Sequence, residues 1–158
     1  AVRGPAVGVG SSIALAADLG IPGESAYFLQ AFSRIGLVPD GGAAWLLTKA
    51  VGRPRAMELM LLGERLEARQ ALEWGLINRV VADTDLDTTA IDLAAKLARG
   101  PTRAFGLIRD LAWCAADTPI EATLEAERSA QRTAGRTADA IEGVTAFAQK
   151  REARFIGR

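Results

Sequence analysis

The sequence contains no histidine and a single cysteine, Cys114, among its 158 residues. One cysteine excludes an internal disulfide, and the missing histidine removes the side chain that most often serves as a metal ligand or as an acid–base group near neutral pH. Carboxylates and backbone amides must therefore carry any proton chemistry of this chain. We expect no metal site.

Neither sign of charge is in excess, because 19 Lys and Arg residues are balanced by 19 Asp and Glu residues. That balance argues against a general nucleic-acid or anionic-membrane surface, so any phosphate contact must be local. No apolar run is long enough to cross a bilayer, and residues 1–20 lack the charged start and cleavage pattern of a secretory signal. We therefore expect a cytoplasmic protein without a nucleic-acid or membrane partner.

The apolar patterns predict an α/β segment followed by helices only. Residues 1–10 predict a short strand that ends in a glycine-spaced turn, and a strand at this place has no partner nearby in the sequence. An N-terminal portion with further strands is therefore expected to be missing. The other predicted elements are strands at 18–21, 26–28 and 76–81 and helices at 11–17, 42–50, from 54 onward, 67–74, 87–99, from 101 onward, 119–133 and 138–151.

Residues 32–47 place one acid, Asp40, among apolar residues at a turn that opens a helix. Pro39 has no backbone N–H, while Gly41 and Gly42 allow a strained turn or a close approach to a ligand. Asp40 can cap the helix by accepting from the N–H groups of its first turn, or it can act as an acid–base group. On residue types alone the capping role is favoured.

The glycines at Gly8 and Gly10 do not fit a nucleotide-binding loop, because no third glycine stands in register and no Gly-Lys-Ser/Thr sequence follows. The alternative is that glycine lets backbone N–H groups at the start of a helix face an oxyanion. That role needs no particular side chain.

Several spaced segments together resemble the enoyl-CoA hydratase/isomerase, or crotonase, superfamily from end to end. They are residues 1–10, Asp18, residues 32–42 and residues 71–77. The segments around Asp40 and at 126–151 are most similar to isomerases of phenylacetyl-CoA degradation. The resemblance implies an α/β fold, a crotonase-like ββα spiral whose C-terminal part is residues 1–82. Residues 83–158 would form an α-helical C-terminal trimerisation region, giving a homotrimer or a homohexamer.

The same resemblance implies an acyl-CoA thioester as substrate and no separate cofactor, since coenzyme A belongs to the substrate. In the family the thioester oxygen lies between two backbone N–H groups. One of them matches Val9, where any residue but proline can donate, and the other lies on a more N-terminal strand that is absent from this chain. Gly8, Phe32 and Val38 match positions that contact the substrate.

The resemblance also separates two reactions of the family. The two glutamates with which its hydratases activate water match Ser12 and Phe32 here, and neither side chain is a general base at neutral pH. Hydration is therefore disfavoured. Several isomerases and one dehalogenase group carry an active aspartate at or beside the position of Asp40, so in this context a catalytic Asp40 is favoured over a cap.

The expected function is that of an enoyl-CoA isomerase in which Asp40 moves the proton and the N–H of Val9 forms half of the oxyanion hole. Phe147 and Lys150 match positions through which the family's tail contacts the CoA of a neighbouring subunit, with a solvated helix end as the alternative. The alternative functions are an enoyl-CoA hydratase and, because the first oxyanion strand is missing, a truncated non-catalytic subunit that binds acyl-CoA or only oligomerises.

Overall fold

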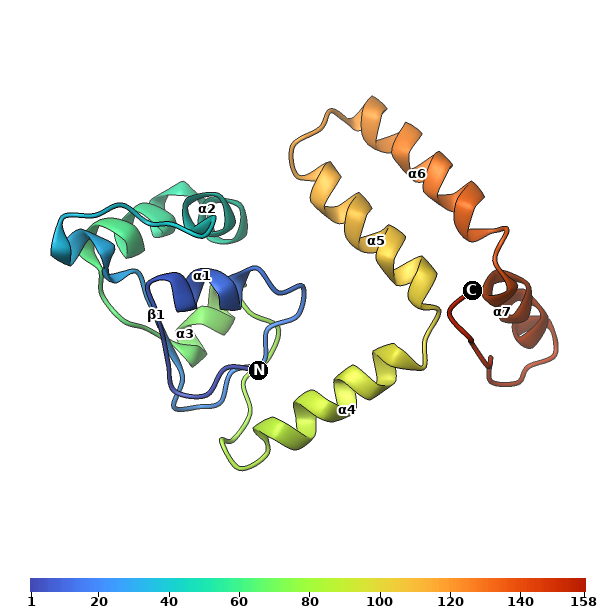
Figure 1. The fold of residues 1–158 in the computed structure, drawn as a ribbon, viewed down its shortest axis with the longest axis horizontal. Coiled ribbons are helices and arrows are strands. Elements are labelled where there is room, and N and C mark those ends of the chain that lie inside the picture. The colour runs from blue at the N-terminus through green and yellow to red at the C-terminus, as the bar shows by residue number, and fades with distance from the viewer. The chain divides into compact units, whose positions relative to one another are not determined.

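The computed structural model describes residues 1–158 and divides into two compact units, Ala1–Ile91 and Asp92–Arg158. The division falls within helix α4 (Leu86–Ala98), C-terminal to the boundary that the sequence predicts at residue 82. All strands belong to the first unit, and the second unit contains helices, turns and a C-terminal tail (Figure 1). Each unit is described by itself.

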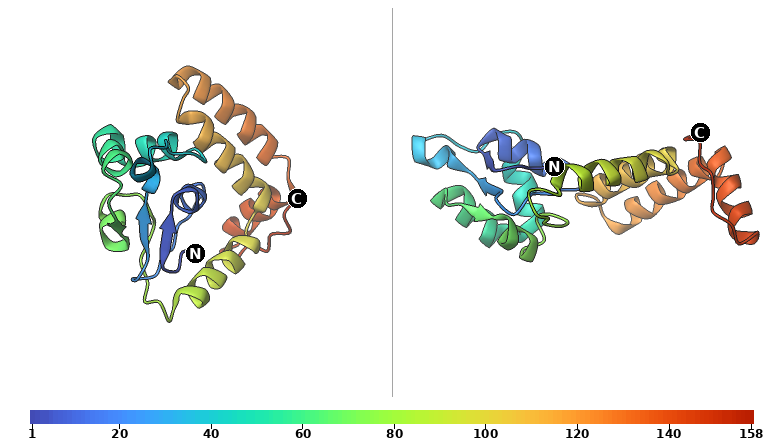
Figure 2. Two further views of the ribbon diagram at one scale, coloured as in Figure 1. Left: turned by 60° about the vertical axis from the view of Figure 1, so that its left-hand side comes forward. Right: turned by 90° about the horizontal axis from the view of Figure 1, so that it is seen from below.

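The first unit alternates short strands with helices, as its apolar pattern predicts. Its elements are β1 (Pro5–Val7), α1 (Val9–Leu15), β2 (Tyr27–Leu29), the 3-10 helix η1 (Ala31–Ile35), α2 (Ala43–Leu62), β3 (Leu66–Glu67) and α3 (Ala68–Glu73). The strands form one sheet in the order β1-β2-β3. Strand β1 is parallel to β2 and β3 is antiparallel to it, with Phe28 paired to Ala6 on one side and to Leu66 on the other. Strands β1 and β2 lie side by side in both Figure 1 and Figure 2.

Gly8 connects β1 to α1 because its backbone is left-handed, with φ 56°, a conformation that a side chain would strain. Its N–H donates to the carbonyl of Leu29 at 2.8 Å, which prolongs the β1–β2 pairing up to the first residue of the helix. The predicted order of strand, turn and helix at the N-terminal end is therefore confirmed, and helix α1 is the connection between the two parallel strands.

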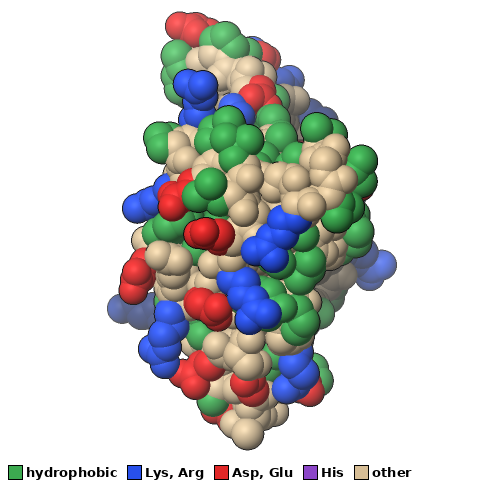
Figure 3. Space-filling view, turned by 90° about the vertical axis from the view of Figure 1, so that its left-hand side faces the viewer, with side chains coloured by type: hydrophobic (Ala, Val, Ile, Leu, Met, Phe, Trp, Pro, Cys, Tyr) green, Lys and Arg blue, Asp and Glu red, His purple; other side chains and the backbone are tan.

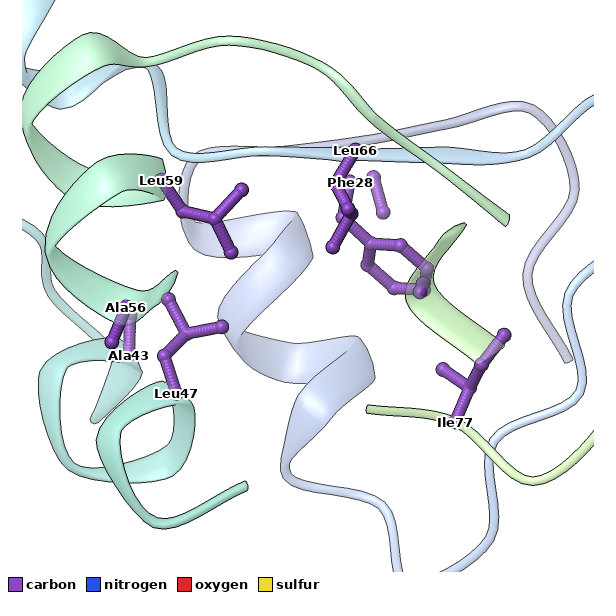
Figure 4. Packing of buried hydrophobic residues seen from close by; sticks show 9 residues of the cluster. Phe28, Ala43, Leu47, Ala56, Leu59, Leu66 and Ile77 are labelled. Atoms are coloured by element: carbon purple, nitrogen blue, oxygen red, sulfur yellow. The ribbon is translucent and has the colours of Figure 1, made fainter. Parts of the chain in front are cut away.

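The hydrophobic core of the first unit is formed by the sheet and the helices α1, α2 and α3. Figure 4 shows Leu47 and Leu59 of α2 near Ala43 and Ala56, and Phe28 and Leu66 from the sheet on the other side of the view. The buried cluster contains Ala6, Phe28, Ala43, Leu47, Ala56, Leu59, Leu66, Ala71 and Ile77. Because four of its members are alanines, the backbones approach closely, and a few leucines and one phenylalanine fill the remaining space.

Helix α2 contains a kink where the sequence predicts two separate helices. Gly52 leaves the helical conformation with φ 77° and ψ 161°, and Pro54 follows within the same element. A proline ring clashes with the carbonyl four residues before it and has no N–H to donate, so the first segment cannot continue in a straight line. The two predicted helices are therefore present as the two arms of α2.

Two of the predicted strands are wrong. Residues 18–21 and 76–81 form bends and irregular backbone, and only single bridges pair Val2 with Pro22 and Gly23 with Val81. Near them the N–H of Gly20 donates to Oδ1 of Asn78 at 2.7 Å, so a side chain takes the place of a ladder hydrogen bond. Strand β3, which the sequence analysis did not predict, is only two residues long and forms because it meets β2.

The second unit contains α5 (Thr102–Ala115), α6 (Ile120–Ala134) and α7 (Ala138–Ala148), close to the predicted ranges. Helices α5 and α6 lie side by side as a hairpin (Figures 1 and 2). The predicted cap of α7 is confirmed, because Oγ1 of Thr137 accepts from the N–H of Ala140 at 3.1 Å. Helix α7 ends before the predicted residue 151, because Lys150 adopts a left-handed backbone conformation.

The surface is mixed in charge. On the face in Figure 3, basic and acidic side chains alternate with hydrophobic ones, and no extended area carries a single sign. None of the helices combines the length with the apolar character that a bilayer span requires.

Replacing Leu47 by alanine tests the core of the first unit. Leu47 is 1% exposed within the cluster, so Leu47→Ala leaves a cavity and is expected to lower the free energy of unfolding by about 2–5 kcal/mol. Leu61, on the same helix, is 63% exposed, and Leu61→Ala is expected to change the free energy of unfolding by less than about 0.5 kcal/mol. Chemical denaturation followed by circular dichroism measures both. Equal losses would contradict the assignment of Leu47 to the core.

Candidate active site

The candidate site begins at the first turn of α1. Val9 is the first residue of this helix, and the N–H groups of a first turn have no acceptor within the helix. Its side chain is about half exposed, so the start of the helix is not covered by the rest of the first unit. The sequence predicts an oxyanion contact at this N–H, and that contact stays a prediction.

The Asp40 loop lies directly on this first turn. Ser12 is fully buried and its hydroxyl donates to the backbone carbonyl of Asp40 at 2.9 Å. Gly41 has φ 59°, and a carbon added to it would lie 2.9 Å from Cβ of Ser12 and 3.4 Å from Cγ2 of Val9. Only glycine therefore fits between the loop and the helix. This contact brings Asp40 beside Val9, although the two residues are far apart in the sequence.

Phe32, on η1, also lies at this site. A carbon added at Gly8 would lie 3.6 Å from Cζ of Phe32, so the aromatic ring packs beside the glycine that precedes α1. Gly8, Val9, Phe32 and Asp40, four of the predicted site residues, thus lie around one place on the first unit. These four residues lie together in the folded first unit without any rearrangement of its helices or strands.

The capping role of Asp40, which residue types alone favour, is wrong. Helix α2 has Gly42 as its N-cap and no side-chain cap hydrogen bond. The backbone carbonyl of Asp40, rather than its carboxylate, accepts from the N–H of Ala43 at 3.1 Å. The physical reason is that Gly41 and Gly42 are both left-handed and turn the chain between Asp40 and the helix. The residue is exposed, and its carboxylate is not used to start α2.

Three apolar side chains shortly before Asp40 in the sequence are exposed, one at the end of η1 and two on the loop. Ile35, Leu37 and Val38 are all exposed, and Val38 is 80% exposed. Large apolar side chains gathered on a loop in this way are typical of a surface that a ligand or another chain covers. Val38, a predicted substrate contact, is therefore accessible beside Asp40.

The remaining predicted residues lie in the second unit. Phe147, on α7, is 87% exposed, and Lys150 follows that helix with φ 52°. They are close to each other, because the N–H of Lys150 donates to the carbonyl of Phe147 at 3.1 Å. They form a second group, which belongs to the second unit.

The structural role of Ser12 was not predicted. By resemblance Ser12 only replaces a hydratase glutamate, whereas in the structure its buried hydroxyl holds the Asp40 loop. A glycine pair directly after Asp40 was the one local signal that the loop packs closely against something. Nothing in the sequence indicates which residue it packs against, because the partner is on another element.

The enoyl-CoA hydratase/isomerase family model matches residues 1–158, and the chain belongs to that family. It is 48% identical over its whole length to 1,2-epoxyphenylacetyl-CoA isomerase of Escherichia coli, of which it covers 60%. It is 44% identical to a protein of Rhodobacter capsulatus named as a probable enoyl-CoA hydratase, of which it covers 62%. A solved enoyl-CoA hydratase of Bacillus anthracis matches 98% of the chain with a TM-score of 0.93 and 31% identity, and 60% of that protein is covered.

The family resemblance and the crotonase-like α/β fold expected from the sequence are confirmed, as is the similarity to a phenylacetyl-CoA-type isomerase. The chain spans about 60% of the length of the curated relatives it matches. Isomerase and hydratase both occur among the names of the relatives. The choice between the two reactions therefore depends on the side chains at the site.

A pair of glycine variants tests the seating of the Asp40 loop. Gly36 and Gly41 are both left-handed, but a carbon added at Gly36 meets nothing within 4 Å, whereas one added at Gly41 meets Ser12. Gly36→Ala is expected to cost roughly 1 kcal/mol of stability through backbone strain alone. Gly41→Ala is expected to cost at least roughly 2 kcal/mol, because it adds overpacking to the same strain. Denaturant unfolding measures the difference, and equal costs would contradict the contact.

Proposed function

We propose that the complete protein to which this chain belongs is an enoyl-CoA isomerase, which shifts a double bond in the acyl group of a CoA thioester. The observation that carries the proposal is the set of side chains at the site. Asp40 offers an exposed carboxylate beside the start of α1, while the hydroxyl of Ser12 is buried and donates to a carbonyl, and Phe32 carries only an aromatic ring. One carboxylate is sufficient for a proton shift but leaves no second base to activate water.

In the proposed mechanism the carboxylate of Asp40 removes a proton from the carbon alpha to the thioester of a 3-enoyl-CoA. The electron pair moves towards the thioester oxygen, and the resulting dienolate is stabilised by the N–H of Val9 and by a second N–H donor on a strand outside this chain. The protonated Asp40 then returns the same proton to the gamma carbon, which leaves the 2-enoyl isomer. The proton is conserved, and the reaction needs no cofactor beyond the CoA of its substrate.

The apolar neighbours of Asp40 have a part in this proposal. Phe32 and Val38 would contact the acyl chain, and Gly8 lets the backbone of the α1 turn approach the thioester closely. Once an acyl group covers the exposed apolar side chains of the loop, water is excluded from the carboxylate. In this proposal Asp40 is the base, Val9 is the oxyanion donor, and Phe32 and Val38 form the acyl surface.

The proposal assigns residues 1–82 to the C-terminal part of the ββα core, with further strands N-terminal to it, and residues 83–158 to oligomerisation. Exposed apolar side chains on the second unit support this assignment, since such surfaces are typical of subunit contacts. Examples on α5, α6 and α7 are Ile108, Ile120, Leu124, Ile141 and Val144. Phe147 and Lys150 would meet the CoA of a neighbouring subunit in a homotrimer or homohexamer.

Hydration is the second candidate, because one of the relatives is named as a hydratase. It requires a base that holds water, and the matching positions Ser12 and Phe32 do not supply one. A non-catalytic subunit that binds acyl-CoA is the third. Isomerase and hydratase assays on the same enoyl-CoA substrates separate the three candidates. An isomerase shifts the double bond, a hydratase adds water, and a non-catalytic subunit does neither.

Asp40→Asn tests the catalytic assignment in the complete protein. The amide keeps the size of the side chain but cannot take a proton, so turnover of a 3-enoyl-CoA is expected to fall by roughly two or more orders of magnitude. Because the carboxylate does not cap α2, the melting temperature is expected to stay the same. Ser12→Ala removes only the hydrogen bond beneath the loop and is expected to lower turnover far less. Wild-type turnover in a normally folded Asp40→Asn variant would overturn the site.

The oligomer prediction is tested by light scattering on the chain at micromolar concentration. The exposed apolar faces of α5, α6 and α7 are expected to be covered by further copies, giving a mass of three subunits or a multiple of three. A folded monomer at that concentration would contradict both the oligomerisation of residues 83–158 and the CoA contact between subunits.

A further inference from the structure

Lys150 is the one residue other than glycine whose backbone is left-handed, with φ 52°. Its N–H donates to the carbonyl of Phe147, and the N–H of Arg151 donates to the carbonyl of Ala146, each at 3.1 Å. This pair of hydrogen bonds ends a helix with a residue that is ordinarily glycine, because a side chain is strained there. A cation near the end of α7 meets the negative end of the helix dipole, but a lysine one residue earlier would do so without strain. Strain of this kind points to a function for the side chain.

The chain after Lys150 runs back along α7 and is tied to it by Glu142. The guanidinium of Arg151 donates to both carboxylate oxygens of Glu142, at 2.6 and 2.9 Å. The backbone N–H of Arg154 donates to the same carboxylate at 2.8 Å. The hydrogen bonds from Arg151 and from the backbone of Arg154 lower the pKa of Glu142 to about 2, so this carboxylate stays charged below the usual range of a glutamate. The side chain of Glu142 therefore holds two residues of the tail, Arg151 through its guanidinium and Arg154 through its backbone N–H.

A second tie lies one turn earlier on α7. Asp139 is only 3% exposed, and its carboxylate accepts from the N–H groups of Ile156 and Gly157 at 2.7 and 2.9 Å. The ring of Phe155 packs beside Gly143, where an added carbon would lie 3.6 Å from Cε1 of the ring. A buried carboxylate that is satisfied by two backbone donors is costly to disrupt. The end of the tail is thus fixed on the same helix as Phe147.

We propose that residues 151–158 form a clamp that holds the turn at Lys150 so that its ammonium and the ring of Phe147 are presented together to a ligand. Glu142 acts in it as a positioning residue, because it contacts Arg151 and not the ligand. An exposed aromatic ring stacks on a nucleobase, and a lysine beside it binds phosphate. The inference rests on the proposed function, in which the ligand that fits this pair is the 3′-phosphoadenosine end of CoA.

The clamp is tested by Glu142→Gln with Glu125→Gln as the matched control. Glu125 also pairs with an arginine, Arg128, but on α6. Calorimetry on the complete protein measures binding of CoA and of dephospho-CoA, which lacks the 3′-phosphate. Glu142→Gln is expected to weaken CoA binding by roughly 5-fold or more and to reduce the preference over dephospho-CoA, while Glu125→Gln leaves both affinities unchanged. In turnover, Glu142→Gln is expected to raise KM with kcat nearly unchanged, which a general loss of folding would not do.

Lys150→Gly provides a second variant that is expected to fold well. Glycine removes the strain at φ 52°, so the melting temperature is expected to rise by about 2–4 °C while the preference for CoA over dephospho-CoA is lost. A rise in melting temperature with unchanged preference would show that Lys150 only ends the helix, and would overturn the inference. A fall in melting temperature would overturn the account of strain on which it depends.

The outcomes separate this inference from the proposed function. Wild type that binds CoA with a preference that neither Glu142→Gln nor Lys150→Gly alters would overturn the clamp and leave the isomerase proposal standing. Wild type that binds no CoA would overturn both. Loss of turnover in Asp40→Asn has no bearing on the clamp, because Asp40 and Glu142 lie in different units.

Discussion

Close packing of the Gly41 backbone on the side chains of Ser12 and Val9 is the contact on which the candidate site depends. Gly41 has no side chain, so the loop can rest on Ser12 and Val9, and the buried hydroxyl of Ser12 then holds the carbonyl of Asp40. Since this contact uses the backbone of Asp40, the carboxylate remains available. A side chain at Gly41 would have to displace either α1 or the loop, and Asp40 would lose its fixed place beside Val9.

The small core of the first unit serves the same arrangement. Its alanines let the elements pack closely, with α2 on α1 and α1 on β1, and the kink at Gly52 separates the two arms of α2. The loop that carries Asp40 lies between η1 and α2, so its two ends are fixed by packed elements. The apolar side chains of Leu37 and Val38 remain exposed on this loop.

In the second unit, carboxylates of α7 are hydrogen-bonded to the C-terminal tail, whereas those of an ordinary solvated helix end face water. Carboxylates on α7 accept hydrogen bonds from the backbone of the tail, and one of them also pairs with Arg151. These hydrogen bonds offset the backbone strain of the left-handed Lys150. The two candidate groups therefore share one principle, in which a strained or glycine-dependent backbone position is supported by contacts from a neighbouring element.

The sequence by itself determined the helices, the family and the residue types at the site. Helices α4 to α7 and the cap at Thr137 follow from periodicity and from hydrogen bonds between neighbours in the chain, which a sequence displays directly. Only the tertiary structure decided that residues 76–81 do not form a strand, that the backbone of Asp40 and not its carboxylate faces α2, and that the tail folds back onto Glu142. Each of these depends on a partner distant in the sequence, and local patterns carry no information about which distant groups will meet.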